Sequence, residues 1–294
     1  MRGLLAGIFI GLGIVALAMT GAYVWLGHRT TAILGQKFAV PLVKVAVPAD
    51  SASVAEGERL AWLRGCHGCH DAQLQGRVFL DEPRVARLVA PNIPATIASY
   101  NDAELDRLIR HGIRRDSTGV LLMPSASFYF LTDADVGRII AHLRAAPLVE
   151  RSLPTNELRI MGKLGILEGE FLPAAATMDH AAPRVDDPQD TTVAGRGAYL
   201  ARTICVECHG ATLAGDATTP PLFHATGYSA SQFVSLMLDG RSRDGRDLGL
   251  MGRTARARFV HFLPAEIDAL YAYLRELSPG APTAPTAAAA AGGR

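Results

Sequence analysis

Two copies of the pentapeptide Cys-x-x-Cys-His lie far apart in the chain, at residues 66–70 (CHGCH) and 205–209 (CVECH), and they contain all four of its cysteines. This spacing is the attachment signature of a c-type haem. Each thiol adds to one vinyl group of the porphyrin, and the adjoining histidine becomes the proximal ligand of the iron. The sequence therefore predicts two covalently bound haem c groups, which suit a protein that moves single electrons.

The motifs assign a role to each reactive side chain that they contain. The expected covalent haem sites are Cys66, Cys69, Cys205 and Cys208. The expected proximal iron ligands are His70 and His209. No cysteine then remains to form a disulfide in an oxidising compartment.

Other uses of paired cysteines fit this pattern less well. The halves of a zinc ribbon normally lie about 15–20 residues apart and need no trailing histidine, whereas these motifs are far more widely separated. A thioredoxin-like pair would lie beside a βαβ pattern, which neither motif shows. Disulfides would close very tight loops and would leave the duplicated histidine without a role.

An uncharged apolar segment runs from Gly3 to Gly27. A helix of that length spans the hydrocarbon core of a bilayer, and Tyr23 and Trp25 fall where interfacial aromatic residues are common. The alternative is a cleaved secretory signal. The apolar run exceeds the usual signal length, however, and its Ala-x-Ala sequence at residues 16–18 lies inside the run rather than after it. We therefore expect an uncleaved transmembrane anchor.

The remaining composition narrows the class of protein. The 294 residues are enough for two modest domains and an anchor, and the net charge of +1 argues against general nucleic-acid binding. The sequence has no Walker-type glycine loop, nucleophile elbow or His-Glu-x-x-His motif. It therefore predicts an electron carrier and no catalytic residues of its own.

The regions around the two motifs resemble each other beyond the cysteines. The sequence GERLA precedes the first motif and GAYLA precedes the second, at residues 57–61 and 197–201. Both motifs continue as His-x-Ala-x-Leu-x-Gly, at residues 70–76 and 209–215. We interpret each half of the chain as one haem-binding unit that occurs twice.

Helical signals recur in the same order in both halves, and strand signals are scarce, so we expect a mainly α-helical fold. Ser53 and Glu56 form a candidate capping box that would begin the helix leading to the first motif. The other expected helices, several with capping signals or apolar stripes, cover residues 101–111, 132–145, 192–204, 229–238 and 264–277.

These signals divide the chain into six segments. The expected segments are a transmembrane anchor at 3–27, an extended tether at 28–50, a first haem domain at 51–148, a linker at 149–190, a second haem domain at 191–278 and a disordered, low-complexity tail at 279–294.

The sixth ligand of each iron decides whether the haem is closed or open to other ligands. Met123 and Met251 are the candidates, because each lies in an expected loop before the last helix of its half. Five histidines could compete, namely His67, His111, His142, His224 and His261. We expect His67 to be exposed, and His111 and His142 to be surface or capping groups near helix ends.

A proximal histidine needs an acceptor for its other ring nitrogen, and a backbone carbonyl often supplies it. The segments at residues 91–93 (PNI) and 220–222 (PPL) could wrap the proximal faces of the two haems. Arginines near the distal loops have three interpretations: they neutralise haem propionates, they form a docking face for an acidic partner, or they form a solvated face balanced by acidic neighbours. They are Arg114, Arg115, Arg241, Arg243, Arg246, Arg253, Arg256 and Arg258.

The chain resembles the class I cytochromes c at residues 53–148 and 192–278, and its domains are similar to those in cytochrome subunits of bacterial membrane-bound dehydrogenases. The segments that carry the resemblance are GAYLARTICVECHGATLAG, SYNDAELDRLIRHGI and MPSASFYFLTDADVGRIIAHLR. The resemblance implies two tandem cytochrome c domains with Met123 and Met251 as distal ligands. The chain departs from such subunits in having two haem motifs where they often have three.

The expected function is periplasmic electron transfer by a membrane-anchored di-haem cytochrome c. Single electrons would pass from a dehydrogenase or other respiratory donor to an oxidase or another cytochrome. The alternatives are a di-haem peroxidase and an obligate cytochrome subunit of a dehydrogenase complex. The expected location is the bacterial inner membrane, with a single span and both haem domains in the periplasm. The positive-inside rule mildly opposes this orientation, but haem attachment outside the cytoplasm, which the resemblance implies, favours it.

Overall fold

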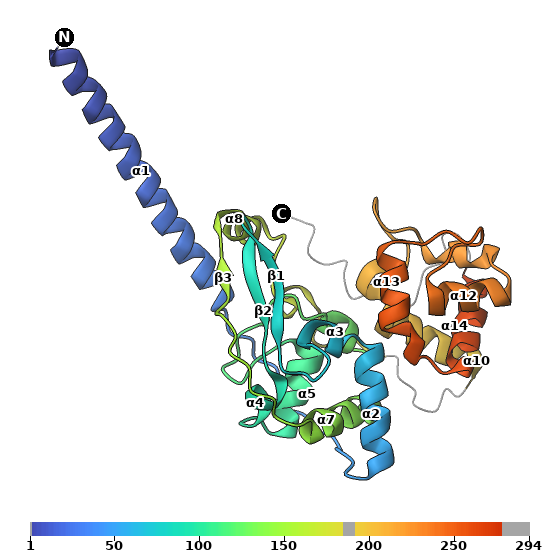
Figure 1. Cartoon of the computed structure of the whole chain (residues 1–294). Helices are drawn as coiled ribbons and strands as arrows, with labels where there is room; N and C mark the ends of the chain where they lie inside the picture. The colour runs from blue at the N-terminus through green and yellow to red at the C-terminus, as the bar shows by residue number, and fades with distance from the viewer. Residues whose placement is uncertain (1, 185–191, 278–294) are drawn as a thin grey trace.

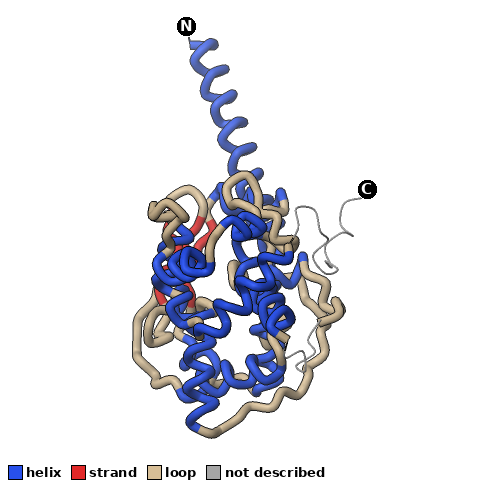
Figure 2. Tube along the Cα trace, turned by 90° about the vertical axis from the view of Figure 1, so that its right-hand side faces the viewer, coloured by secondary structure: helices blue, strands red, loops and turns tan. Residues whose placement is uncertain are grey.

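The computed structural model describes residues 2–184 and 192–277, and within these residues the fold is mainly helical. A long N-terminal helix projects from the rest of the described chain (Figure 1 and Figure 2). The tail expected at residues 279–294 and the end of the linker expected at 149–190 lie outside the described residues.

The projecting helix, α1 (Arg2–Leu34), is apolar and exposed over most of its length. Its 33 residues and its mean hydropathy of 2.3 over an 18-residue window are sufficient to cross a membrane. Its last turns contact α8 (Ile160–Glu168), where Lys163 Nζ donates to the Tyr23 hydroxyl at 3.3 Å. The helix therefore continues beyond Gly27, and its end lies against the body of the protein.

The segment after α1 is extended and packs against the first half of the chain. The Phe38 amide donates to the Ser117 carbonyl at 2.9 Å, and Val45 is buried. The Ala46 carbonyl lies so close to Gly137 that a Cβ on that glycine would be only 2.2 Å from its oxygen. These contacts make the segment an integral part of the fold.

A cluster of buried apolar side chains, which we call the first core, joins the main helices of the first half. Its members include Leu60, Leu105 and Ile140. The helices that contribute them are α2 (Ser51–Leu63), α5 (Asp102–His111) and α7 (Asp133–Ala145). Short helices α4 (Ile93–Ile97), α6 (Ser125–Phe128) and α9 (Ala174–Thr177) also belong to this half.

The helix boundaries follow the capping signals of the sequence, with one exception. The capping box at the start of α5 is confirmed, since the Glu104 amide donates to Asn101 Oδ1 and the Asn101 amide donates to Glu104 Oε2, both at 2.9 Å. The capping box predicted at Ser53 is wrong. Asp50 caps α2 instead, because its carboxylate accepts from the Ser53 amide at 2.9 Å.

A small antiparallel sheet, which was not expected from the sequence, extends from the first half (Figure 1). Its strands are β1 (Arg77–Glu82), β2 (Ala86–Ala90) and β3 (Glu157–Leu158), in that order. The strands are short and β1 is mostly exposed on both faces. Such a strand lacks the apolar alternation by which half-buried strands are recognised.

The second half has its own cluster of buried side chains, the second core, which includes Leu200, Phe233 and Leu270. Helix α10 (Val193–Leu200) continues through a π-helical turn, Ala201–Cys205, into α11 (Val206–His209), which holds the end of the second haem motif. The remaining helices are α12 (Ala230–Asp239), α13 (Leu250–Ala257) and α14 (Pro264–Glu276), with 3-10 turns at Leu222–Gly227 and Phe259–His261.

Both halves place a glycine at the contact between the helix before the haem motif and the last helix. A Cβ on Gly57 of α2 would lie 1.9 Å from the Arg138 carbonyl of α7, and one on Gly197 of α10 would lie 2.2 Å from the Ala269 carbonyl of α14. The two helix pairs therefore cross at a similarly close distance. The repeat seen in the sequence extends to this packing.

We predict that Gly57→Ala and Gly197→Ala each lower the free energy of unfolding by about 1–3 kcal/mol, because the added methyl forces the helices apart. Urea denaturation measures the loss. Gly21→Ala is the matched control, since nothing lies within 4 Å of a Cβ at that position of helix α1. Variants as stable as the parent protein would contradict the close helix contact.

Candidate haem attachment sites

The first haem motif forms a short helix, α3 (Cys66–His70), directly after α2. Gly65 joins the two helices with a φ of 82°, a conformation that side chains with a Cβ rarely adopt. The His70 Nδ1 atom lies 2.8 Å from the Pro91 carbonyl oxygen. A carbonyl only accepts, so Nδ1 donates and the lone pair of Nε2 is left for a metal.

The second motif repeats this arrangement. His209 Nδ1 donates to the Pro220 carbonyl at 2.8 Å. Burial lowers the pKa of both His70 and His209, which favours the neutral imidazole that ligates iron. The acceptors expected from the sequence, in the segments 91–93 and 220–222, are thus found in place.

The backbone after each motif also repeats residue by residue. Leu74 and Leu213 both adopt positive φ, 59° and 58°, and Gly76 and Gly215 follow at 79° and 70°. The amides of these two glycines donate to the carbonyls of the preceding motif histidines at 2.8 and 2.9 Å. Non-glycine residues seldom adopt positive φ, so the shared conformation indicates a common structural requirement in both copies.

The loops that follow α5 and α12 match in the same way. Each helix ends at a left-handed glycine, Gly112 (φ 64°) or Gly240 (φ 68°). The carbonyl of that glycine accepts from the amide eight residues later, Val120 at 2.8 Å or Leu248 at 3.1 Å. The two loops therefore fold back at corresponding positions.

The two candidate methionines occupy equivalent positions, each three residues after this loop-closing contact. Met123 lies in a loop and packs against the first core. Met251 packs against the second core, but its predicted loop location is wrong, because Gly249 (φ 59°) is followed at once by α13. Met251 is therefore on the first turn of a helix.

A cavity of about 1270 Å³ opens beside the first motif. Cys66, Cys69 and His70 line it together with Met123 and Phe128. Its volume exceeds the range of about 300–1000 Å³ typical of small-ligand pockets. Two thiols, the His70 imidazole held through its Nδ1 atom, and the Met123 thioether all line this cavity. This set of groups fits a covalently bound haem. The wall also includes residues of α1, β2 and α13.

Two histidines that were expected at the surface are buried. His67, predicted to be exposed, is only 5% exposed, and His142 is only 9% exposed. The His67 ring stacks on Trp62 with centroids 4.1 Å apart, and its Nδ1 atom lies 2.9 Å from the Ala72 carbonyl oxygen. Trp62 also stacks on His261, with ring centroids 5.2 Å apart. Burial lowers the pKa of His67 to about 4.

The arginines near the distal loops separate into three groups. Arg114, Arg253 and Arg258 line the cavity. Others satisfy acidic neighbours on the surface, as in the ion pairs of Arg246 with Asp244 (2.6 Å) and of Arg256 with Asp247 (2.8 Å). The remaining members, Arg115, Arg241 and Arg243, bond to Glu104 and to the carbonyls of residues 245 and 227.

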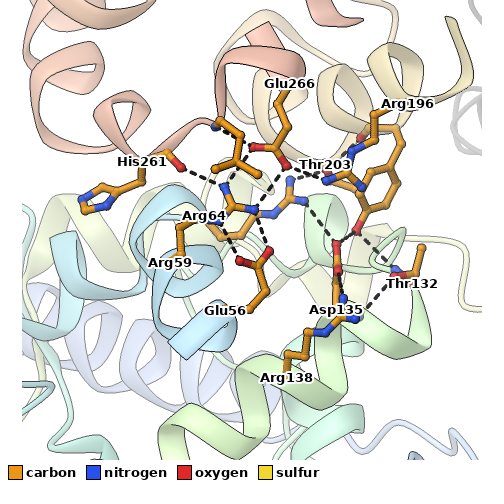
Figure 3. A network of polar contacts seen from close by, with 12 residues as sticks. Glu56, Arg59, Arg64, Thr132, Asp135, Arg138, Arg196, Thr203, His261 and Glu266 are labelled. Carbon is orange, nitrogen blue, oxygen red and sulfur yellow. Dashed lines mark hydrogen bonds and ion pairs between the residues drawn. The ribbon is translucent and has the colours of Figure 1, made fainter. Parts of the chain in front are cut away.

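A network of charged side chains connects the two halves of the chain (Figure 3). Arg59 of α2 donates to Glu266 of α14 at 2.9 Å and to the His261 carbonyl at 2.8 Å. Tyr199 of α10 donates to Asp135 of α7 at 2.6 Å. These contacts could not be predicted from the sequence, because no local pattern marks pairs so distant in the chain.

Comparisons with known proteins agree with this geometry. Residues 194–278 match the family model described as Cytochrome c. The chain is 25% identical to the fructose dehydrogenase cytochrome subunit of Gluconobacter japonicus, over 81% of this chain and 55% of that protein. It is 26% identical to the cytochrome c subunit of a quinone alcohol dehydrogenase from Gluconacetobacter polyoxogenes, over 80% and 58%.

A third relative is a diheme cytochrome c-type protein of Cereibacter sphaeroides, 27% identical over 53% of this chain and 56% of its own length. The chain thus spans little more than half the length of these relatives. The resemblance to c-type cytochromes is confirmed, and the chain contains a cytochrome c domain. Two of these relatives are named as cytochrome subunits of dehydrogenases, which agrees with the expectation of an electron carrier rather than an enzyme.

We predict that the protein loses stability as the pH falls from about 6.5 to about 4. The pKa of His67 is about 4 in the folded chain and about 6.5 in an unfolded one. Between these values the unfolded chain binds more protons, so the free energy of unfolding decreases as the pH falls. His111, whose pKa burial also lowers to about 4, acts in the same direction.

Urea denaturation across this pH window measures the effect. His67→Phe keeps an aromatic ring against Trp62 and removes one titrating group, so its stability should depend less on pH than that of the parent protein. His224→Gln alters an exposed histidine and is the control. If His67→Phe and the parent protein showed the same pH dependence, the role assigned to His67 would be wrong.

Proposed function

We propose that the chain is a membrane-anchored di-haem cytochrome c made of two tandem cytochrome c domains. It carries single electrons from a dehydrogenase to a respiratory acceptor. The observation that carries the proposal is the duplicated geometry of the proximal histidines. Each donates through Nδ1 to a proline carbonyl at 2.8 Å, directly after a pair of cysteines at haem-attachment spacing.

In the first domain Cys66 and Cys69 hold the haem, and His70 and Met123 ligate its iron. In the second domain Cys205, Cys208, His209 and Met251 have the same roles. The bound haem supplies an iron that accepts and releases one electron. The protein fixes the direction of each imidazole, shields the cavity with apolar side chains and keeps a thioether at the end of the distal loop.

Both sixth positions are filled in this proposal, and this favours an electron carrier over a di-haem peroxidase, which needs an open iron. The equivalent positions of Met123 and Met251 after matching loop contacts support the assignment. Two relatives are named as cytochrome subunits of dehydrogenases, which supports a function within a larger dehydrogenase complex. The chain would supply the route by which electrons leave that complex.

The proposed location is the bacterial inner membrane, with α1 as a single span and both haem domains in the periplasm. The support for it is the length and apolar composition of α1 and the haem motifs. The end of α1 lines the cavity of the first haem motif through residues Tyr23–Leu34. The first domain would therefore lie at the membrane surface.

We predict that the full-length protein, expressed with a c-haem maturation system, carries two haems. Intact mass spectrometry should show the added mass of both, and the reduced protein should give c-type absorption bands. The oxidised protein should show the weak far-red band of a methionine bound to ferric iron. A single haem, or a high-spin iron without that band, would instead favour the peroxidase.

We predict that Met123→Ala and Met251→Ala each lower the reduction potential of one haem, because methionine ligation favours ferrous iron. Each fall should be a measurable fraction of the roughly 0.8 V that axial ligands span. Potentiometric titration followed by absorbance measures both haems. Met161→Ala is the control, because that methionine is half exposed and lies outside both cores. A potential unchanged by either substitution would refute that ligand.

A further inference from the structure

One arginine side chain lies between the two haem motifs. Arg258, which follows α13, donates from Nη1 to Glu207 Oε2 at 2.9 Å. Glu207 is one of the two residues between Cys205 and Cys208. Arg258 Nε also donates to the Leu63 carbonyl at 3.2 Å. The same guanidinium thus bonds inside the second motif and at the end of the helix that leads to the first.

The approach to the first motif is equally close. A Cβ placed on Gly65, the residue before Cys66, would lie only 2.9 Å from the guanidinium carbon of Arg258. Arg258 and Glu207 both line the cavity that holds Cys66 and Cys69. The side chains of Arg258 and Glu207 therefore lie between the backbones of the two haem motifs at this point.

A second arginine makes the reciprocal contact. Arg64, which precedes Gly65, is 1% exposed and donates through Nη1 to Thr203 Oγ1, two residues before Cys205. The nearest carboxylate to Arg64 in an ion pair is that of Asp135, whose Oδ2 atom lies 3.9 Å from Arg64 Nη2. Among the described residues, Arg64 Nε and Nη2 have no hydrogen-bond partner. The first half thus extends a positive charge towards the second motif, and the second half extends one towards the first.

These charges act at both motifs. Burial raises the pKa of the Cys66 and Cys205 thiols to about 12, and the positive charges of Arg258 and Arg64 oppose that rise at both cysteines. A charge that stabilises a thiolate at both positions also acts on a group attached there. Half-buried charges interact more strongly than charges in water because the local dielectric constant is lower.

We propose that the Arg258–Glu207 ion pair is shared by the two haems: it holds their attachment segments in contact, and its two charges act on both reduction potentials in opposite directions. The inference rests on the proposed function, in which both motifs carry haem. Reduction adds one electron and no proton, so a positive charge nearby favours the ferrous form and a negative charge the ferric form. Arg258 is a positioning residue, since it acts through the two motifs.

The test uses the full-length, doubly haem-loaded protein and its Arg258→Ala, Glu207→Gln and double variants, each titrated potentiometrically. Arg258→Ala leaves the Glu207 carboxylate alone between the motifs, so both potentials should fall. Glu207→Gln leaves the guanidinium alone, so both should rise. Each ferrous-to-ferric equilibrium constant should change roughly tenfold. The double variant restores the net charge of the pair, and both potentials should return towards those of the parent protein.

Arg256→Ala is the matched control, because it removes an arginine whose carboxylate partner, Asp247, lies outside both motifs. Thermal unfolding separates packing from charge, since the double variant restores charge but not the bridging contacts. Potentials that stay constant while stability falls would overturn the proposal, and so would a shift confined to one haem. If Arg258→Ala fails to mature, Glu207→Gln alone still decides, because its potentials must rise together. A parent protein lacking either haem would instead refute the proposed function.

Discussion

The hydrogen bond between each motif histidine, His70 or His209, and a proline carbonyl is the constraint on which the rest of each proposed haem site depends. It fixes the tautomer and the direction of the imidazole, so it determines where an iron can lie relative to the cysteines. The turn with positive φ after each motif helps to hold that carbonyl beside the histidine. Leu74 and Leu213 adopt positive φ there, and the amides of Ile93 and Leu222 then return to the carbonyls of these leucines at 2.8 and 2.9 Å.

The same constraint explains why the two halves agree most closely in backbone conformation and less in secondary structure. The loop-closing contacts of Gly112 and Gly240 are preserved, although Met123 lies in a loop and Met251 begins a helix. In the proposed function, each thioether would need only to reach the iron from a backbone position that the loop fixes. In the first half, the hairpin of β1 and β2 lies between the motif and Pro91. In the second half, a short loop without strands connects the motif to Pro220.

The features that local patterns encode could be predicted from the sequence. The haem motifs, the capping box at Asn101 and the proline carbonyls each depend on residues close in the chain or on one recognisable spacing. The burial of His67 could not be predicted, because it requires Trp62, His142 and His261 to meet from three segments. The contact of Arg258 with Leu63 joins residues 195 positions apart, and no periodicity marks it.

The contacts between the two halves fix the position of one Cys-x-x-Cys-His motif relative to the other. Leu63 of α2 is part of the second core, and Tyr199 of α10 packs against both cores. Arg59, Arg64 and Glu266 add charged contacts across the same boundary, where a buried charge deprived of its partner is costly. The relative position of the two haem motifs is therefore set by direct packing between helices that precede and follow them. Helix α1 packs against the first half, so these contacts also fix the direction of α1 relative to the second half.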